Sequence, residues 1–131
     1  MKTFTRAALV AAAFFLLATA FVAGEGTRSG GLISPDEAKA LLDSDPKVIL
    51  LDVRTKEEFA EGHIPGAILL PYDAVTEKTA RAAIPSRESV VVVYCRSGRR
   101  SAIAAERLRS LGYGTVWDLG GIHRWPYEVV R

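Results

Sequence analysis

The sequence of 131 residues contains a single cysteine, Cys95, and only two histidines. One cysteine cannot form an intramolecular disulfide or a CxxC redox pair, and so few thiol and imidazole groups exclude a cysteine-rich zinc site. Six prolines and eleven glycines are too few for a collagen-like chain, and 49% hydrophobic residues are too many for a disordered one. The length leaves room for one domain of ordinary size.

The only long hydrophobic run lies at the N-terminus. Lys2 and Arg6 precede an apolar stretch of 17 residues, 7–23, which is interrupted only by Thr19. This layout is typical of a secretory signal peptide, and the small residues at 18 and 20 favour cleavage after Ala20. The stretch is long for a signal and short for a membrane span, so an N-terminal anchor in residues 1–23 is the alternative. Both interpretations predict an exported protein, and we expect it in the periplasm.

The chain also lacks a strong excess of either charge. Its 17 basic and 15 acidic residues become 15 and 15 once Lys2 and Arg6 leave with the signal. A neutral mature chain gives no support for nucleic acid as a partner, and a membrane would be a partner only through an uncleaved N-terminus. The basic residues nevertheless cluster locally at Arg96, Arg99 and Arg100, which indicates a small anionic ligand.

Apolar runs and helical patterns alternate along the rest of the chain. Residues 24–31 are polar and glycine-rich and are interpreted as a linker, which leaves 32–131 for the domain. Capping-box spacings at Ser34 and Thr55 predict two short helices, and a third helix is expected over 101–111. Strands are predicted over 48–51, 67–70, 90–94 and 115–117. This order predicts an α/β fold of three layers, with helices flanking a mostly parallel sheet of about five strands.

The uninterrupted β-branched run 90–94 is expected at the centre of the sheet, and Cys95 follows it directly. Ligands bind open parallel sheets at the carboxyl ends of the strands. The polar residues 96–100 and the helix after them would aim backbone N–H groups and a helix N-terminus at one point, which makes an anion-binding site. Amide dipoles and nearby guanidinium groups favour a thiolate, so Cys95 is a candidate nucleophile. A buried small hydrophobic residue is the alternative interpretation of a lone cysteine.

Residues 95–100, Cys-Arg-Ser-Gly-Arg-Arg, resemble the active-site loop of the rhodanese family of sulfurtransferases, Cys-Arg-x-Gly-x-Arg. Leu-Asp-Val-Arg at 51–54, Glu-Glu-Phe at 57–59 and Gly-His-Ile-Pro-Gly-Ala at 62–67 resemble the N-terminal signature of that family. Leu-Gly-Gly at 119–121, followed by Trp125, is a weaker match. With the exported N-terminus, the chain is similar to the small, single-domain periplasmic rhodaneses.

The resemblance implies that Cys95 takes the sulfane sulfur of thiosulfate or a related donor as a persulfide. Cyanide or a thiol then accepts the sulfur, and neither a metal nor an organic cofactor is required. Arg96 and Arg100 would bind the sulfonate, whereas Arg99 occupies a variable position and is either a further contact or solvated. Gly98 would supply a special backbone conformation. Ser97 and Ser101 would donate hydrogen bonds to the persulfide or cap the following helix, and capping is the favoured role for Ser101. Asp52 and Arg54 are expected to form an ion pair that supports the site.

Three other functions are weighed against this one. Phosphatases and arsenate reductases also use a cysteine loop, but phosphatases place arginine six residues after the cysteine, where this chain has Ser101, and Tyr94 stands where they have histidine. A non-catalytic rhodanese-like binding module typically lacks the cysteine. A dedicated sulfur carrier, which delivers its persulfide only to a partner protein, is not distinguished from a free-standing enzyme by sequence.

Overall fold

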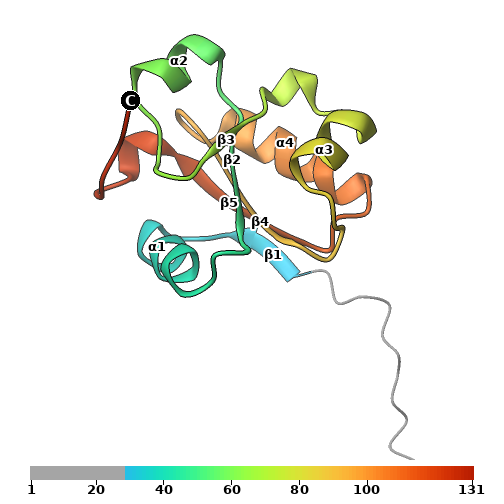
Figure 1. The fold of residues 1–131 in the computed structure, drawn as a ribbon. Helices are drawn as coiled ribbons and strands as arrows, with labels where there is room; N and C mark the ends of the chain where they lie inside the picture. Colours follow the sequence, from blue (N-terminus) through green and yellow to red (C-terminus); the bar gives the residue numbers. More distant parts are fainter. Residues whose placement is uncertain (1–28) are drawn as a thin grey trace, which may run out of the picture.

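The computed structural model describes residues 29–131, and five strands within them form one sheet in the order β1-β5-β4-β2-β3 (Figure 1). Every pairing between neighbouring strands is parallel. The strands are β1 (Ser29–Leu32), β2 (Ile49–Asp52), β3 (Ile68–Leu69), β4 (Val90–Cys95) and β5 (Thr115–Gly121). β4 is the central strand, as its continuous apolar run predicts.

Within residues 29–131, four α-helices and one short 3-10 helix lie between the strands, and a second 3-10 helix follows the last strand. They are α1 (Pro35–Ser44), α2 (Lys56–Glu61), η1 (Tyr72–Ala74), α3 (Glu77–Ala83), α4 (Arg99–Ser110) and η2 (Ile122–Arg124). The predicted capping boxes are present: the side chains of Ser34 and Thr55 each accept a hydrogen bond from the N–H three residues later. Each box satisfies amides that the first helical turn otherwise leaves without partners.

The helices form layers on both faces of the sheet, which confirms the three-layer α/β architecture. On one face, Val91 and Val93 of β4 contact a core that includes α3 and α4. On the other face, Val92 and Tyr94 belong to a second core with α1 and the C-terminal segment around Trp125. Because both faces of β4 are buried, its sequence is apolar without alternation.

Three elements differ from the sequence-based expectations. The predicted linker 24–31 is wrong at its end, because Ser29–Leu32 forms edge strand β1 and pairs with β5. A strand with two glycines has no apolar pattern, and its Leu32 is 83% exposed, so only the pairing with β5 defines it. Helix α3 was not predicted, and α4 begins at Arg99, two residues before the expected start.

The predicted signal or anchor, residues 1–23, lies outside the described residues. Within 29–131, no helix combines the length and the apolar character that crossing a membrane requires.

Candidate active site

Cys95 is the last residue of the central strand β4, and its side chain is fully buried. The chain then turns over three residues into α4, whose N-cap is Gly98. The Gly98 N–H donates to Cys95 Sγ at 3.0 Å, and Sγ lies 3.4 Å from Ser101 Oγ. Gly98 adopts φ +112°, a left-handed conformation that other residues resist, as the sequence analysis anticipated. The loop therefore folds back so that its amides reach the sulfur.

The environment of the sulfur favours the thiolate. Burial by itself raises the pKa of Cys95, but the Ser101 hydroxyl and the backbone N–H groups of Ser101, Gly98 and Ser97 outweigh it, so the pKa lies below its usual value. Hydrogen bonds to a charged acceptor are stronger than those to a neutral one, which is why these donors stabilise the ionised form. The principal causes are therefore neutral donors rather than the expected guanidinium groups, although the charge of Cys95 contributes to raising the pKa of Arg100.

Ser101 has a different role from the one its position suggested. Helix α4 has no side-chain cap, and Ser101 lies in its first turn rather than at the N-cap, so the predicted capping role is wrong. Its fully buried hydroxyl donates to the Gly98 carbonyl at 3.1 Å and accepts the Cys95 thiol proton. The hydroxyl is thus positioned to turn toward the sulfur when the thiol ionises.

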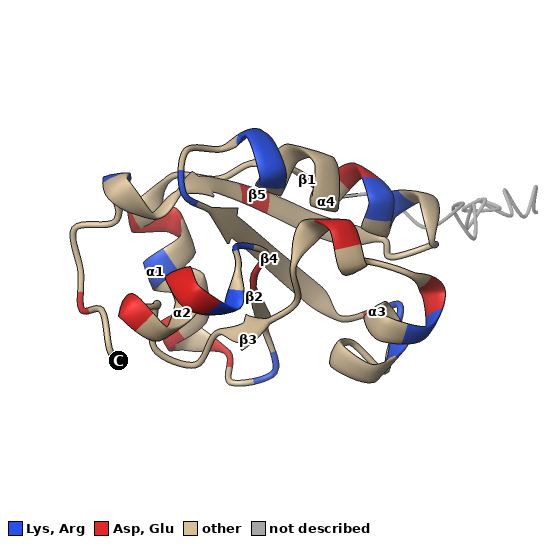
Figure 2. Ribbon diagram, turned by 90° about the horizontal axis from the view of Figure 1, so that it is seen from above, with Lys and Arg blue, Asp and Glu red and all other residues tan. Residues whose placement is uncertain are grey.

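Arg100 is held by a partner that the sequence analysis missed. Its Nη1 and Nη2 donate to the two carboxylate oxygens of Glu58 at 2.7 and 3.0 Å, and both side chains are mostly buried. Arg100 lowers the pKa of Glu58 to about 2, and Glu58 raises the pKa of Arg100. Two of the five guanidinium N–H donors are used in this way, which leaves the others for a substrate. In Figure 2, red segments of α2 and the blue start of α4 mark the two elements that this pair joins.

Asp52 and Arg54 form the predicted ion pair at the end of β2. Arg54 Nη2 lies 2.6 Å from Asp52 Oδ2, and both residues are buried. The Tyr94 hydroxyl donates to the same carboxylate at 2.7 Å and accepts the Ile64 N–H. Arg54 also donates to the carbonyl of Gly62, which ends α2. The pair therefore fixes α2, and with it Glu58, relative to the strand that carries the cysteine.

Arg96, Ser97 and Arg99 lie on the exposed side of the loop. The guanidinium carbon of Arg99 lies 5.9 Å from the centre of the Tyr72 ring. The Arg96 carbonyl accepts a hydrogen bond from His123 Nδ1 at 2.6 Å, which ties the loop to η2. Gly121 permits this contact, because a Cβ at its position would lie 2.3 Å from the Arg96 carbonyl oxygen. The second glycine of the Leu-Gly-Gly match thus has a steric reason.

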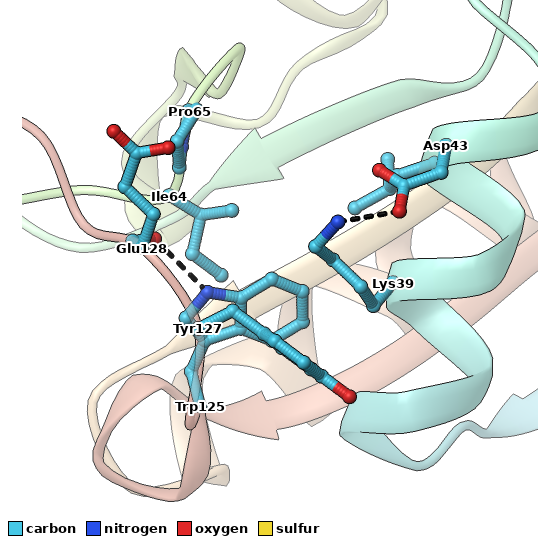
Figure 3. A pocket seen from close by; sticks show the side chains of 8 residues that line it. Lys39, Asp43, Ile64, Pro65, Trp125, Tyr127 and Glu128 are labelled. Atoms are coloured by element: carbon cyan, nitrogen blue, oxygen red, sulfur yellow. Dashed lines mark hydrogen bonds and ion pairs between the residues drawn. The ribbon is translucent and has the colours of Figure 1, made fainter.

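The part of the chain from 29 onward contains no group of three or more histidine, cysteine, aspartate or glutamate side chains suited to a metal. A separate cleft of about 170 Å³ lies between α1 and the C-terminal segment and is lined by Trp125, Tyr127, Ile64, Lys39 and other neighbours, but by no residue of the loop (Figure 3). Trp125 is a core residue, and its indole N–H donates to the Glu128 carbonyl at 3.2 Å.

The fold and the site together define a class: α/β domains that hold a cysteine of lowered pKa in an amide-lined loop at the end of the central parallel strand. Within that class, the rhodanese-like domain family matches residues 34–127. The chain belongs to this family.

Related proteins and structures agree with this assignment. The chain is 40% identical over 72 residues to thiosulfate sulfurtransferase PspE of Escherichia coli, covering 55% of this chain and 68% of PspE. It is 44% identical over 79 residues to a sulfurtransferase of Allochromatium vinosum, covering 60% of this chain and 71% of that protein. A solved rhodanese with anions from E. coli superimposes with a TM-score of 0.60 at 33% identity, covering 64% of this chain and 98% of that one.

Larger proteins contain a similar domain. The chain is 36% identical over 104 residues to an adenylyltransferase and sulfurtransferase of Meyerozyma guilliermondii. This match covers 74% of the chain but only 24% of that protein, so the chain spans about a quarter of its length.

Proposed function

We propose that this protein is a sulfurtransferase that moves the sulfane sulfur of thiosulfate to cyanide or a thiol through a persulfide on Cys95. The observation that carries the proposal is the buried sulfur at the end of β4, which receives the Gly98 amide at 3.0 Å and lies 3.4 Å from the Ser101 hydroxyl. Thiosulfate as the donor is supported by the similarity to PspE, whose name describes that activity.

In the first step, the Cys95 thiolate attacks the outer sulfur of thiosulfate. A bond forms between Sγ and the outer sulfur, the sulfur–sulfur bond of thiosulfate breaks, and sulfite leaves with the electron pair. The outer sulfur of the resulting persulfide carries negative charge, and the converging amides that favour the thiolate are suited to stabilise it as well. We assign Arg96 and the unused N–H groups of Arg100 to the sulfonate, because guanidinium groups bind such oxyanions bidentately.

In the second step, cyanide or a thiolate attacks the outer sulfur. The bond to Sγ breaks and its electron pair returns to Cys95, so the enzyme is regenerated without net oxidation or reduction. No step requires a metal or an organic cofactor. The arrangement of Cys95 in the loop argues against a non-catalytic binding module, because such a module has no use for an activated thiol.

The test is the intact mass of the domain after incubation with thiosulfate, with Cys95→Ser as the control. We expect the wild type alone to gain one sulfur atom, and we expect added cyanide to remove it as thiocyanate. Equal mass gain in both proteins, or no gain in either, refutes the proposal. A persulfide that forms but is not released to small acceptors identifies a dedicated sulfur carrier instead.

We also propose that the protein works in the periplasm. The basic start and apolar run of residues 1–23 support this proposal. Fractionation of cells that express the full chain tests it, and protein recovered only with the cytoplasm contradicts it.

A further inference from the structure

Most of the described arginines whose side chains contact neither a carboxylate nor a backbone carbonyl belong to the cysteine loop and the elements next to it. Residues 29–131 contain ten arginines, and six of them contact a carboxylate or a backbone carbonyl through their side chains. In that part of the chain, the four with no such contact are Arg96, Arg99, Arg124 and the terminal Arg131. Three of these four belong to the loop after β4, the start of α4 and η2, and the hydrogen bond from His123 to the Arg96 carbonyl joins η2 to the loop.

The same segments contain no acidic residue. The stretches 89–105 and 119–127 contain β4, the loop, the first half of α4, the end of β5 and η2, and they hold four arginines without one aspartate or glutamate. Among the nearby carboxylates, Glu58 binds Arg100, Asp52 binds Arg54 and Asp118 accepts the Gly120 N–H, whereas exposed Asp73 of η1 follows Tyr72 in the chain. The described residues therefore present free positive charge at the entrance to the site, although the mature chain is neutral overall.

The donor accounts for only part of this charge. The sulfonate of thiosulfate is one sulfur–sulfur bond, about 2 Å, from the sulfur that is transferred, so it lies within the loop beside Cys95. Arg124 belongs to a different element, and Arg99 projects toward Tyr72. A carboxylate separated from its thiol by two or more carbon atoms would extend from the loop toward these outer arginines.

Resting on the proposed function, we infer that the second substrate is a thiol that carries a carboxylate, and that Arg99 and Arg124 are its specificity determinants. Its thiolate attacks the outer sulfur of the Cys95 persulfide, a new sulfur–sulfur bond forms, and the bond to Sγ breaks. The electron pair returns to Sγ, and the product is the persulfide of the acceptor. The carboxylate lies on the arginine rim formed by Arg96, Arg99 and Arg124 during this attack.

The experiment measures transfer from persulfide that has first been loaded with thiosulfate and checked by mass. Each rate is divided by the concentration of the thiolate form of the acceptor. The ratio of the rate with 3-mercaptopropionate to the rate with uncharged 2-mercaptoethanol is then compared between the wild type and its variants. Exposed ion pairs change affinity about twofold to fivefold each, so the ratio should fall about fivefold or more in Arg99→Ala/Arg124→Ala. It should also fall in the wild type at high salt, because the Debye length near 0.5 M is only about 4 Å.

The matched control is Lys78→Ala/Arg81→Ala, which removes two exposed basic residues from α3 and should leave the ratio at its wild-type value. Cysteine peptides flanked by glutamate or by glycine form a second arm. A larger charge preference among the peptides than among the small thiols identifies a polypeptide acceptor, and the opposite identifies a small molecule; both support the inference. If Arg99→Ala/Arg124→Ala takes up sulfur but keeps the wild-type ratio, or if the ratio falls equally in the control, the inference is refuted and the proposed function stands. Protein that takes up no sulfur refutes the proposed function as well.

Discussion

Replacing Ser101 by alanine should raise the pKa of Cys95 and slow its reactions at neutral pH. In the thiol form, the Ser101 hydroxyl accepts the thiol proton and donates to the Gly98 carbonyl at 3.1 Å. A thiolate only accepts, so on ionisation the hydroxyl turns to the sulfur and gives up the carbonyl. The alanine variant lacks this response.

The magnitude follows from the difference between the two hydrogen bonds. A bond to a charged group contributes about 1.5–3 kcal/mol and a bond between neutral groups about 0.5–1.5 kcal/mol. The bond from the thiol to Ser101 is also lost on ionisation, but S–H is a weak donor, so ionisation gains roughly 1 kcal/mol from the turn. Since 1.36 kcal/mol corresponds to one unit, the pKa of Cys95 should rise by about one unit in Ser101→Ala. A more basic thiolate is also a better nucleophile, with a Brønsted coefficient of about 0.4–0.5, so the rate below the pKa should fall only about threefold.

The assay is the rate of alkylation by iodoacetamide as a function of pH, with Ser110→Ala as the control. Ser110 is exposed at the other end of α4 and donates only to the Arg107 carbonyl, so its loss leaves the sulfur untouched. The midpoint should move to higher pH in Ser101→Ala alone. A midpoint that stays in place or moves to lower pH would show that the backbone amides suffice and that the hydroxyl does not stabilise the thiolate.

Three further changes test the supports of the site. The pKa of Glu58 is about 2, below the ordinary 4.5, so its ion pair stabilises the fold above pH 4.5 and this contribution is lost as pH falls through 2. Glu58→Gln should therefore lower the free energy of urea unfolding by up to about 3 kcal/mol at pH 7, with the difference shrinking toward pH 2; a difference independent of pH contradicts this. Asp52→Asn leaves a buried cation unpaired and should cost about 3–5 kcal/mol, against about 1 kcal/mol or less for exposed Asp43→Asn. Similar melting temperatures for both variants would contradict this reasoning. Gly121→Ala places a Cβ 2.3 Å from a loop carbonyl oxygen and should abolish most persulfide loading, whereas Gly114→Ala meets open space and should load normally; loading in Gly121→Ala at the wild-type level would show that the loop adapts.

Local sequence signals were sufficient for most of the fold. The β-branched run of β4 and the capping boxes at Ser34 and Thr55 each depend on residues close together in the chain, and the structure confirms them. Strand β1 was missed because its glycines and exposed Leu32 carry no pattern, and only pairing with β5 makes it a strand.

The residues of the site likewise fall into those that local sequence predicts and those that depend on distant contacts. The position of Cys95 and the conformation of Gly98 follow from a contiguous loop motif, so the sequence was enough to locate them. The partner of Arg100 is 42 residues away, and Glu58 already had a local explanation in its capping box. A single sequence carries no signal for this ion pair, because the pair forms only when the folded chain brings α2 next to the start of α4.

The pairing of β1 with β5 has a consequence for how the chain folds as it is synthesised. The first strand of the described domain finds its partner only in the last strand, and His63 likewise pairs with Val130, one residue from the end. Contacts between such distant segments cannot form until nearly the whole chain has emerged, and a topology rich in them folds slowly. Until β5 is present, β1 lacks the strand with which it pairs. Removal of Val130 would therefore break the pairing that joins the C-terminal segment to the end of α2.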